Sequence, residues 1–520
     1  MILHILFVLV FSYLFVRFKD RKLYKLSRQL NNDLFTIPFI GHLYLFIGTA
    51  EDRMKLVIYF GRKALNNGGL CALWLGTKLF TVVADPVTFE YLSKTCLEKD
   101  DLTNVAQPLL GNGTIFAPVS IWRPRRKIVA SHFGLARLNS FVDIFSQQSQ
   151  VMIKILKNLE GKGAKSVYNF FKVYSMDSVC ETVLGVKVCA QNESNHPFPK
   201  AFEENCEIFL KKGLKPYIYS TPFYKLTSSY RTFVENNEII RDFVKKIIKS
   251  KREEHENKKE TDITDIDEGI NNHKPQTFLD TMIKTPGNEN LFSDEELLEE
   301  SIVLLIGATD TSATAAALIA MMLSRYPDVQ DKVYNELQKV FNDSDRPVTA
   351  KDLTQLHYLE AVIKETLRLY PPGPVTIRKV DKDVTIPSGL TLVKGSSFLF
   401  HMWAINRNPQ YWGQDADEFK PERFIDGAPV HPAAFSTFSF GPRNCIGYKY
   451  AFLSMKTVIA NLLRNFELLP AEASDIYTIN GKCLEKEKPL RLKFEVMVRD
   501  VSDFSVRLES RVKGHQVIQI

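Results

Sequence analysis

The chain has 520 residues, of which 45% are hydrophobic and 24% are charged. This length and apolar content allow several domains or one large helical domain with a deep core. The formal net charge is only +7 and the basic residues are dispersed, which argues against a dedicated nucleic-acid-binding protein with a dense basic stripe. A modest basic patch remains compatible with an acidic partner or an anionic membrane surface.

Seven widely spaced cysteines are present, and none of them forms a Cys-x-x-Cys pair. Because their number is odd and their spacing is irregular, the sequence indicates neither a disulfide framework nor a structural zinc site. It therefore favours a reducing compartment. The cysteines are Cys71, Cys96, Cys180, Cys189, Cys206, Cys445 and Cys483.

The amino-terminal segment is apolar from Met1 to Val16 and is followed by a basic run. A cleaved signal peptide carries its positive charge before the apolar run and a small-residue cleavage site after it, and neither is present. We therefore expect residues 1–18 to form an uncleaved membrane anchor and residues 19–45 to form a basic, proline-containing linker.

Two short apolar segments, residues 73–76 and 80–86, flank a turn at Gly76 and predict a pair of strands. Helical periodicity predominates elsewhere, so we expect a mainly α fold with small β-sheets, that is, an α+β protein. Further strand segments bounded by Gly or Pro are expected at residues 375–378, 384–386, 390–393 and 397–400.

A predicted helix contains Trp122 and Arg126, which are four positions apart and therefore share one face. An indole N–H and a guanidinium that point the same way form a donor pair for a carboxylate. An ordinary surface pair has the same spacing, so the pattern alone leaves both interpretations open.

Residues 140–250 have mostly helical periodicity, with an aromatic-rich break at residues 216–224. This break suits either a loop that dips into a membrane interface or a cover over an apolar pocket. The charged residues 245–274 are expected to form a solvated, mobile connection.

A capping box at Ser293 starts the longest predicted helix, which covers residues 297–325. Asp310 is the one charged residue of its central part, within a run of hydroxyl side chains. Such a run is costly inside a bilayer, so a buried central helix is favoured over a transmembrane span. Gly307 lets a flat object approach closely, and Thr311 can bond back to a carbonyl and kink the helix.

Two more helices are expected over residues 327–341 and 356–369. Glu365 and Arg368 lie three positions apart on one face of the second of these helices. With Arg423 they predict a buried charged cluster, although Glu365 and Arg368 alone would match an ordinary helix-surface pair.

A Gly-rich loop carries one cysteine whose neighbours suit a reactive role. Gly441 and Gly447 let the backbone bend close to a flat macrocycle, and backbone N–H groups can hold the Cys445 sulfur deprotonated. Arg443 can reach an acidic edge group of a cofactor, and Phe438 can shield the sulfur from water. The loop therefore predicts a thiolate ligand for a haem iron, against the alternative of a buried structural cysteine in a turn.

In residue pattern, order and spacing, these segments resemble the cytochrome P-450 family. The resemblance extends from the apolar amino terminus to about residue 498, and the cysteine loop is its most specific part. The matching motifs are Trp122-x-x-x-Arg126, the helix centre from Gly307 to Ser312, Glu365-x-x-Arg368, Pro421-Glu422-Arg423-Phe424 and Phe438-x-x-Gly441-x-Arg443-x-Cys445-x-Gly447.

The resemblance implies a cytochrome P-450 fold, in which a long central helix lies over the haem and Cys445 binds the iron. It implies that Asp310 and Thr311 deliver protons during oxygen activation, and that the charged cluster lies behind the cysteine loop. The residues implied to contact the haem or its propionates are Trp122, Arg126, Gly307, Arg378, Phe438, Gly441, Arg443 and Gly447.

Within that family the chain is similar to the microsomal clan of fatty-acid omega-hydroxylases and insect enzymes, through residues 38–41, 278–280 and 404–409. Many members of this clan carry, where Gly307 stands, a glutamate that can form an ester with the haem. Gly307 cannot form that bond, so the resemblance implies haem b (iron protoporphyrin IX) held non-covalently. Asn406 replaces the usual histidine, with no consequence that the sequence assigns.

The implied activity is that of a membrane-bound monooxygenase, which inserts one oxygen atom of O2 into an apolar fatty acid, odorant, hormone or xenobiotic. Electrons would come from NADPH through a separate flavoprotein reductase, with a small haem electron carrier as a further donor, because the chain has no Gly-rich dinucleotide fingerprint. Arg125, Lys127 and Lys449 are candidates for docking the reductase.

Two other activities remain open: a haem-thiolate isomerase or dehydratase acting on lipid peroxides, and a non-catalytic haem-based ligand binder. The intact Asp310–Thr311 pair disfavours the isomerase or dehydratase, which needs no proton delivery to dioxygen. We expect a catalytic domain over residues 46–500, on the cytosolic face of the endoplasmic reticulum membrane, and a tail over residues 501–520. No nucleic-acid partner is expected.

Overall fold

The chain folds into two compact units, each made of segments that are distant in sequence. The first unit contains the residues up to Asp101, Leu367–Cys445 and Arg491–Val501, and the second contains the remaining segments. The computed structural model describes residues 4, 11, 15–30, 34–193, 196–214, 222–261, 276–283, 292–427, 431–472, 490–495 and 497–511.

A sheet of order β1-β2-β7-β4 is the core of the first unit. β1 (Leu70–Leu75) and β2 (Lys78–Val83) form the predicted antiparallel pair, with Gly76 in the turn at a φ of +64°. β2 pairs in parallel with β7 (Ser397–Phe400), which pairs antiparallel with β4 (Thr376–Lys379). β1 and β2 are almost fully buried, which explains why their sequences are mostly apolar.

Helices and short ladders surround this sheet. The helices are α2 (Arg21–Gln29), α3 (Ala50–Asn66), α4 (Pro86–Thr95), α18 (Met402–Ile405) and α19 (Pro409–Trp412). The ladders pair β5 (Val384–Thr385) with β6 (Thr391–Leu392), and β9 (Leu492–Glu495) with β10 (Met497–Asp500). α3 packs against both β1 and β9.

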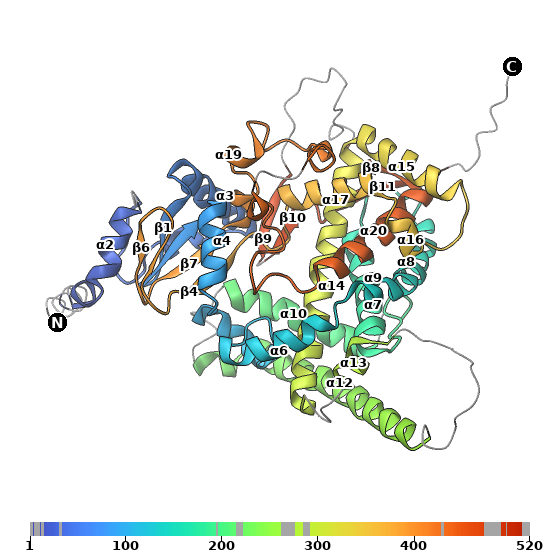
Figure 1. The fold of residues 1–520 in the computed structure, drawn as a ribbon, viewed down its shortest axis with the longest axis horizontal. Coiled ribbons are helices and arrows are strands. Elements are labelled where there is room, and N and C mark those ends of the chain that lie inside the picture. Colours follow the sequence, from blue (N-terminus) through green and yellow to red (C-terminus); the bar gives the residue numbers. More distant parts are fainter. Residues whose placement is uncertain are drawn as a thin grey trace. The chain divides into compact units, whose positions relative to one another are not determined.

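The second unit is organised around α14 (Asp294–Arg325), the long yellow helix in Figure 1. Ser293 caps it as predicted: the Ser293 hydroxyl accepts the Glu296 N–H, and the Glu296 carboxylate accepts the Ser293 N–H. Among the described helices, α14 alone is long and apolar enough to cross a membrane, but 67% of its apolar window is buried. The prediction of a buried central helix is therefore confirmed.

Three helices pack against α14 and hold it in place. They are α9 (Tyr168–Val179), α12 (Ser228–Thr261) and α20 (Tyr448–Asn465). A sheet of order β3-β11-β8 contributes β8 (Phe466–Pro470), which also contacts α14. The helix is therefore supported along its length by α-helical and β neighbours.

The other helices of this unit are all shorter than α14, and the first of them precede α9 in the chain. They are α5 (Gln107–Leu110), α6 (Val119–Ser131), α7 (Leu135–Ser140), α8 (Val142–Lys157), α10 (Pro197–Leu214), α13 (Phe278–Ile283), α15 (Pro327–Phe341), α16 (Ala350–Leu353) and α17 (His357–Leu369). α15 and α17 match the helices predicted over residues 327–341 and 356–369. The last residues of α17 belong to the first unit.

The mainly helical architecture with small sheets is confirmed, but the charged segment 245–274 differs from the prediction. α12 continues to Thr261, so the first part of that segment is helical. The reason is a periodic apolar face, since the buried residues Ile240, Val244 and Ile248 recur every four positions. High charge content on the exposed face concealed this periodicity.

Other predicted segments fall partly or wholly beyond what the structure describes. The anchor over residues 1–18 is described only at residues 4, 11 and 15–18, and most of the aromatic-rich break at 216–224 lies outside the described residues. In the tail, β11 (Ser505–Ser510) pairs with β3 (Lys165–Ser166) and with β8. The fold therefore continues past residue 501, where the sequence showed no pattern.

Candidate functional site

The loop that carries Cys445 is a tight turn in the first unit. The Cys445 N–H donates to the Phe438 carbonyl over 2.8 Å, and the Asn444 N–H donates to the Gly441 carbonyl over 3.0 Å. Gly441 has a φ of +73°, and a Cβ there would lie 2.9 Å from the Ser93 carbonyl oxygen. No other residue fits this position without strain, so the loop presents the exposed Cys445 side chain from a fixed backbone.

Three cations converge in the same unit, although the sequence predicted only two of them. Arg378 is 1% exposed; one of its Nη atoms donates to the Cys96 carbonyl, while its Nε is buried with no hydrogen-bond partner in the described part of the chain. Burial, and then the guanidinium groups of Arg378 and Arg443, lower the pKa of Lys99 well below its usual range. Grouped cations of this kind suit an acidic ligand group.

The centre of α14 offers an accessible face within a mostly buried stretch of helix. Leu304, Gly307, Ala308 and Thr311 follow the i, i+3, i+4, i+7 spacing of one face; the first three are partly accessible and Thr311 is exposed. A Cβ added at Gly307 would meet nothing within 4 Å. A flat group can therefore lie against this face at close range.

Thr311 makes the predicted back-bond, since its hydroxyl donates to the Gly307 carbonyl over 2.5 Å. α14 nevertheless runs through this point as one continuous α-helix. The hydroxyl is thus held by the backbone on the accessible face, where it can exchange partners.

Asp310 has a different neighbour, which sequence reasoning missed. The Tyr168 hydroxyl donates to the Asp310 carboxylate, and the Tyr168 ring stacks on Phe504 with centroids 5.5 Å apart. Adjacent helix positions point about 100° apart, so the Asp310 carboxylate is held toward α9 rather than on the face of Thr311. Nothing in the sequence linked Tyr168 to Asp310, because 142 positions separate them.

Trp122 and Arg126 lie on α6, as predicted, with Trp122 buried and Arg126 half-buried. Their four-residue spacing puts both on one helix face. This placement fits the proposed donor pair.

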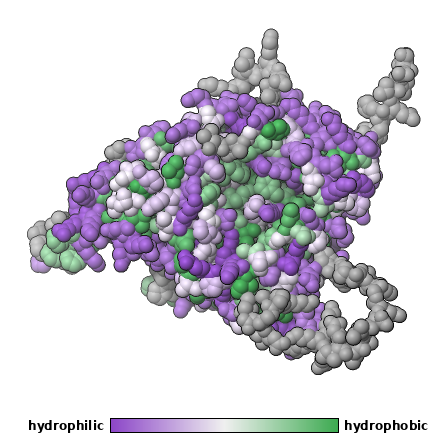
Figure 2. Space-filling model, viewed as in Figure 1, coloured by the Kyte–Doolittle hydropathy of each residue, from purple (hydrophilic) through white to green (hydrophobic). Residues whose placement is uncertain are grey.

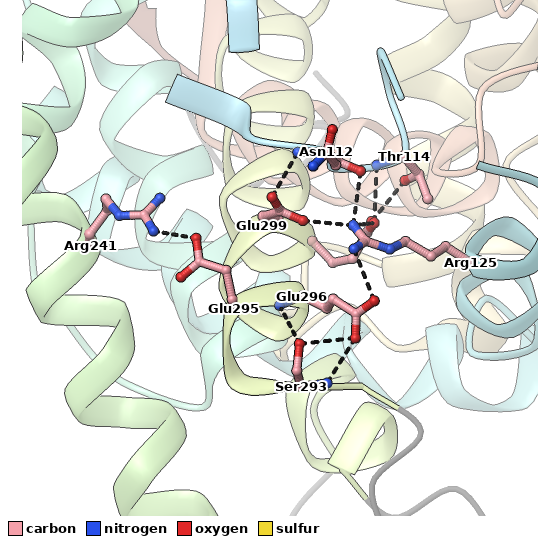
Figure 3. Close-up of polar contacts among 9 residues, drawn as sticks. Asn112, Thr114, Arg125, Arg241, Ser293, Glu295, Glu296 and Glu299 are labelled. Atoms are coloured by element: carbon pink, nitrogen blue, oxygen red, sulfur yellow. Dashed lines mark hydrogen bonds and ion pairs between the residues drawn. The ribbon is translucent and has the colours of Figure 1, made fainter. Parts of the chain in front are cut away.

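Arg125 was predicted to be a surface cation for docking a partner, and this prediction is wrong. Its guanidinium is buried and forms ion pairs with Glu299 at 2.7 Å and Glu296 at 3.0 Å (Figure 3). It also donates to the Asn112 carbonyl over 2.8 Å. Arg125 therefore ties α6 and the loop at residues 111–114 to the amino-terminal part of α14.

Glu300, at the next position of α14, belongs to the same cluster, because it lies 3.5 Å from the Arg125 guanidinium. It is fully buried and accepts the Thr114 N–H over 3.0 Å and the Thr114 hydroxyl over 2.8 Å. Burial raises the pKa of Glu300 to about 7, although the Thr114 hydrogen bonds and the charge of Arg125 act in the opposite direction. The loop is thus fastened by a carboxyl group that titrates near neutral pH.

Arg368 and Arg423 hold one segment of the first unit, at residues 415–418. The fully buried Arg368 donates to the carbonyls of Ala416 over 2.6 Å and Glu418 over 3.0 Å. Arg423 pairs with the Asp415 carboxylate at 2.9 Å and donates to its carbonyl. The segment at residues 415–418 thus contacts both arginines, and its Asp415 is an acidic partner of Arg423 that the motifs did not indicate.

Asn406, to which the sequence assigned no consequence, connects α17 to the chain before the cysteine loop. Its amide donates to the Arg368 carbonyl over 3.0 Å and to the Thr437 hydroxyl over 2.9 Å. The side-chain Oδ1 of Asn406 accepts the Ser436 N–H over 2.8 Å. Asn406 therefore fixes the segment at residues 436–437, which leads into the cysteine loop at Phe438.

A thiol on a rigid loop and clustered cations in the first unit, and a small-residue helix face in the second unit, are features that suit a haem-thiolate protein. The haem fits these residues because buried cations suit its propionates and the open position at Gly307 suits its flat ring. A family model described as cytochrome P-450 matches residues 33–494, which is most of the chain.

Three relatives show the same similarity over most of their length. The chain is 31% identical to cytochrome P-450 4d2 of Drosophila melanogaster, over 85% of this chain and 89% of that protein. It is 30% identical to cytochrome P-450 4V2 of Mus musculus, over 82% of each chain, and 28% identical to cytochrome P-450 4c21 of Blattella germanica, over 92% of each. The chain therefore belongs to the cytochrome P-450 family. It is an oxidoreductase of the monooxygenase type, with haem b bound non-covalently through a cysteine thiolate.

The Glu300 carboxyl group predicts a measurable pH dependence of stability. Because its folded-state pKa is raised from 4.5 to about 7, Glu300 binds its proton more tightly in the folded state, and the stability that this provides is lost as pH rises through that window. We expect Glu300→Gln to match the natural protein near pH 4 and to be more stable by about 3 kcal/mol near pH 8.

Urea unfolding of both proteins at the two pH values measures this difference. Glu295→Gln is the control, because Glu295 pairs with Arg241 on the exposed side of α14 (Figure 3). A gain for Glu300→Gln of the same size at both pH values would contradict the assignment.

Proposed function

We propose that the chain is a monooxygenase of the endoplasmic reticulum membrane with its catalytic domain on the cytosolic face. We propose further that it takes electrons from NADPH through a flavoprotein reductase and oxidises an apolar small molecule. The observation that carries this proposal is the Cys445 loop, whose backbone geometry leaves one exposed thiol on a fixed turn. Family membership supports a reductase partner and apolar substrates in general terms.

In this proposal Cys445 would hold the haem iron through its thiolate. The bound haem supplies oxygen activation, and the protein supplies the ligand, the charges and the pocket. Arg378, Arg443 and Arg126 would neutralise acidic edge groups, and the Trp122 indole N–H and the Lys99 amine would donate hydrogen bonds to them. Burial of the cations strengthens their attraction for a carboxylate, because the local dielectric constant is low.

Proton delivery is assigned to Thr311 and Asp310. The Thr311 hydroxyl can accept and donate a proton while its bond to the Gly307 carbonyl keeps it on the accessible face of α14. Asp310 would exchange protons with that hydroxyl only through water, because the Tyr168 hydroxyl holds its carboxylate toward α9. The apolar neighbours Leu304 and Ala308 favour an apolar substrate on this face.

Oxygen-isotope labelling tests the reaction type. With NADPH, a microsomal reductase and labelled O2, an apolar substrate selected by a spectral shift of the haem should gain one labelled oxygen atom. Omission of NADPH or the reductase should abolish product. Turnover of a lipid peroxide without either component would favour an isomerase or dehydratase, and ligand binding without product would favour a non-catalytic binder.

Haem attachment tests the role of Gly307, which has no carboxylate and leaves open space where a side chain would lie. We expect acid–organic extraction to remove all haem from the natural protein. Gly307→Glu is the matched variant, because it supplies the group that can form an ester, and a fraction of its haem should resist extraction after turnover. Haem that stays on the natural polypeptide would contradict the prediction.

Coupling of NADPH consumption to product formation tests the proton path. Thr311→Ala should keep consuming NADPH while product falls by about tenfold and hydrogen peroxide rises, because the hydroxyl on the accessible face is lost. Tyr168→Phe should have a smaller effect in the same direction, because Asp310 loses the hydroxyl group that positions its carboxylate. Thr311→Ser, which keeps the hydroxyl, is the control, and unchanged coupling in Thr311→Ala would contradict the assignment.

A further inference from the structure

A cavity of about 240 Å³ lies in the first unit, next to α2 and apart from the residues assigned to the haem. Its walls come from α2, from the segment at residues 36–39 and from the turn after β1. The lining residues are Val16, Arg17, Tyr24, Ser27, Arg28, Thr36, Ile37, Pro38, Phe39, Trp74, Gly76 and Thr77.

The chemistry of this lining suits an anion. It contains two guanidinium groups, from Arg17 and Arg28, and hydroxyl groups that include those of Ser27 and Thr36, but no Asp or Glu among the lining residues. Residues 15–30 carry six basic side chains and one acidic side chain. A phosphate group is the natural partner for paired guanidinium and hydroxyl donors.

The cavity floor is fixed before any ligand binds. The rings of Tyr24 and Trp74 stack with centroids 4.9 Å apart, and the Trp74 indole donates to the Ser27 hydroxyl over 2.9 Å. Behind Trp74, His42 accepts its backbone N–H over 3.1 Å and contacts the Thr36 hydroxyl at 3.2 Å. The Ser27 and Thr36 hydroxyl groups are thus held in place, which reduces the cost of ordering them on binding.

Large apolar side chains on the bordering segments are exposed to solvent. They are Phe18 at 72%, Phe35 at 74%, Phe39 at 40% and Ile40 at 45% exposure. Exposed aromatic residues next to basic ones are typical of surfaces that meet the interfacial region of a bilayer. The cavity therefore combines an anion-binding interior with an apolar border.

The position of the cavity along the chain fits the same interface. Its first lining residues, Val16 and Arg17, are the point where the apolar amino-terminal run ends. If that run lies in the bilayer, which is part of the proposed function, the cavity lies at the level of the lipid headgroups.

We infer that this cavity binds the phosphate-bearing headgroup of an anionic phospholipid. Arg17 and Arg28 contact the phosphate. The acyl chains extend from the cavity over the exposed side chains of Phe39 and Ile40. The site is distinct from general attraction to a charged membrane, because it depends on two particular guanidinium groups rather than on the number of basic residues.

A double substitution with matched charge tests the site. Arg17→Gln/Arg28→Gln removes both lining cations, whereas Lys22→Gln/Lys25→Gln removes two exposed cations of the same helix that do not line the cavity. The haem-loaded full chain is placed in detergent-free phosphatidylcholine nanodiscs. A short-chain soluble phosphatidic acid is then added in steps, and its binding is followed by tryptophan fluorescence. Trp74→Phe shows whether the signal comes from the cavity.

Binding at least tenfold weaker in the arginine double variant, with at most a twofold change in the lysine double variant, would support the site. Equal weakening in both variants would overturn it, as would inorganic phosphate binding as tightly as the lipid, since that indicates a free-phosphate site. Flotation with phosphatidylcholine vesicles separately tests membrane attachment. A chain that binds the soluble lipid but does not float keeps the site and refutes the proposed attachment.

Discussion

The structure depends most on the backbone constraint around Cys445. Gly441 has no room for a side chain against the Ser93 carbonyl, and the Cys445 N–H closes the turn onto Phe438. The chain entering this loop is fixed by Asn406, and Arg368 holds a neighbouring segment through backbone carbonyls. A thiolate ligand needs such rigidity, because metal ligands are positioned by the hydrogen bonds that surround them.

Buried charge is arranged differently in the two units. In the first unit, Lys99 lies with Arg378 and Arg443, and burial, followed by these like charges, lowers the pKa of the lysine. In the second unit, one arginine meets several acids, and burial raises the pKa of Glu300. Both arrangements cost folding free energy, so each indicates a function. The cations of the first unit attract an acidic ligand group. The arginine and acids of the second unit attach the loop at residues 111–114 to α14.

The sequence predicted well those features that depend on local pattern. The capping box at Ser293, the strand pair around Gly76 and the back-bond of Thr311 each follow from residues close together in the chain. Side-chain contacts between residues far apart in the sequence could not be predicted, as with Tyr168 and Asp310. Arg125 resembled a surface cation because Arg and Lys residues surround it, and only the fold brings Glu299 to it.

The central claim is that Cys445 ligates the haem iron, and the absorption spectrum of the reduced carbon monoxide complex tests it most directly. The natural protein should show the red-shifted band of thiolate ligation, and Cys445→Ser should lose it. Cys189→Ser removes another exposed free cysteine and should keep the band. A red-shifted band that persists in Cys445→Ser, or is absent from the haem-loaded natural protein, would contradict the account.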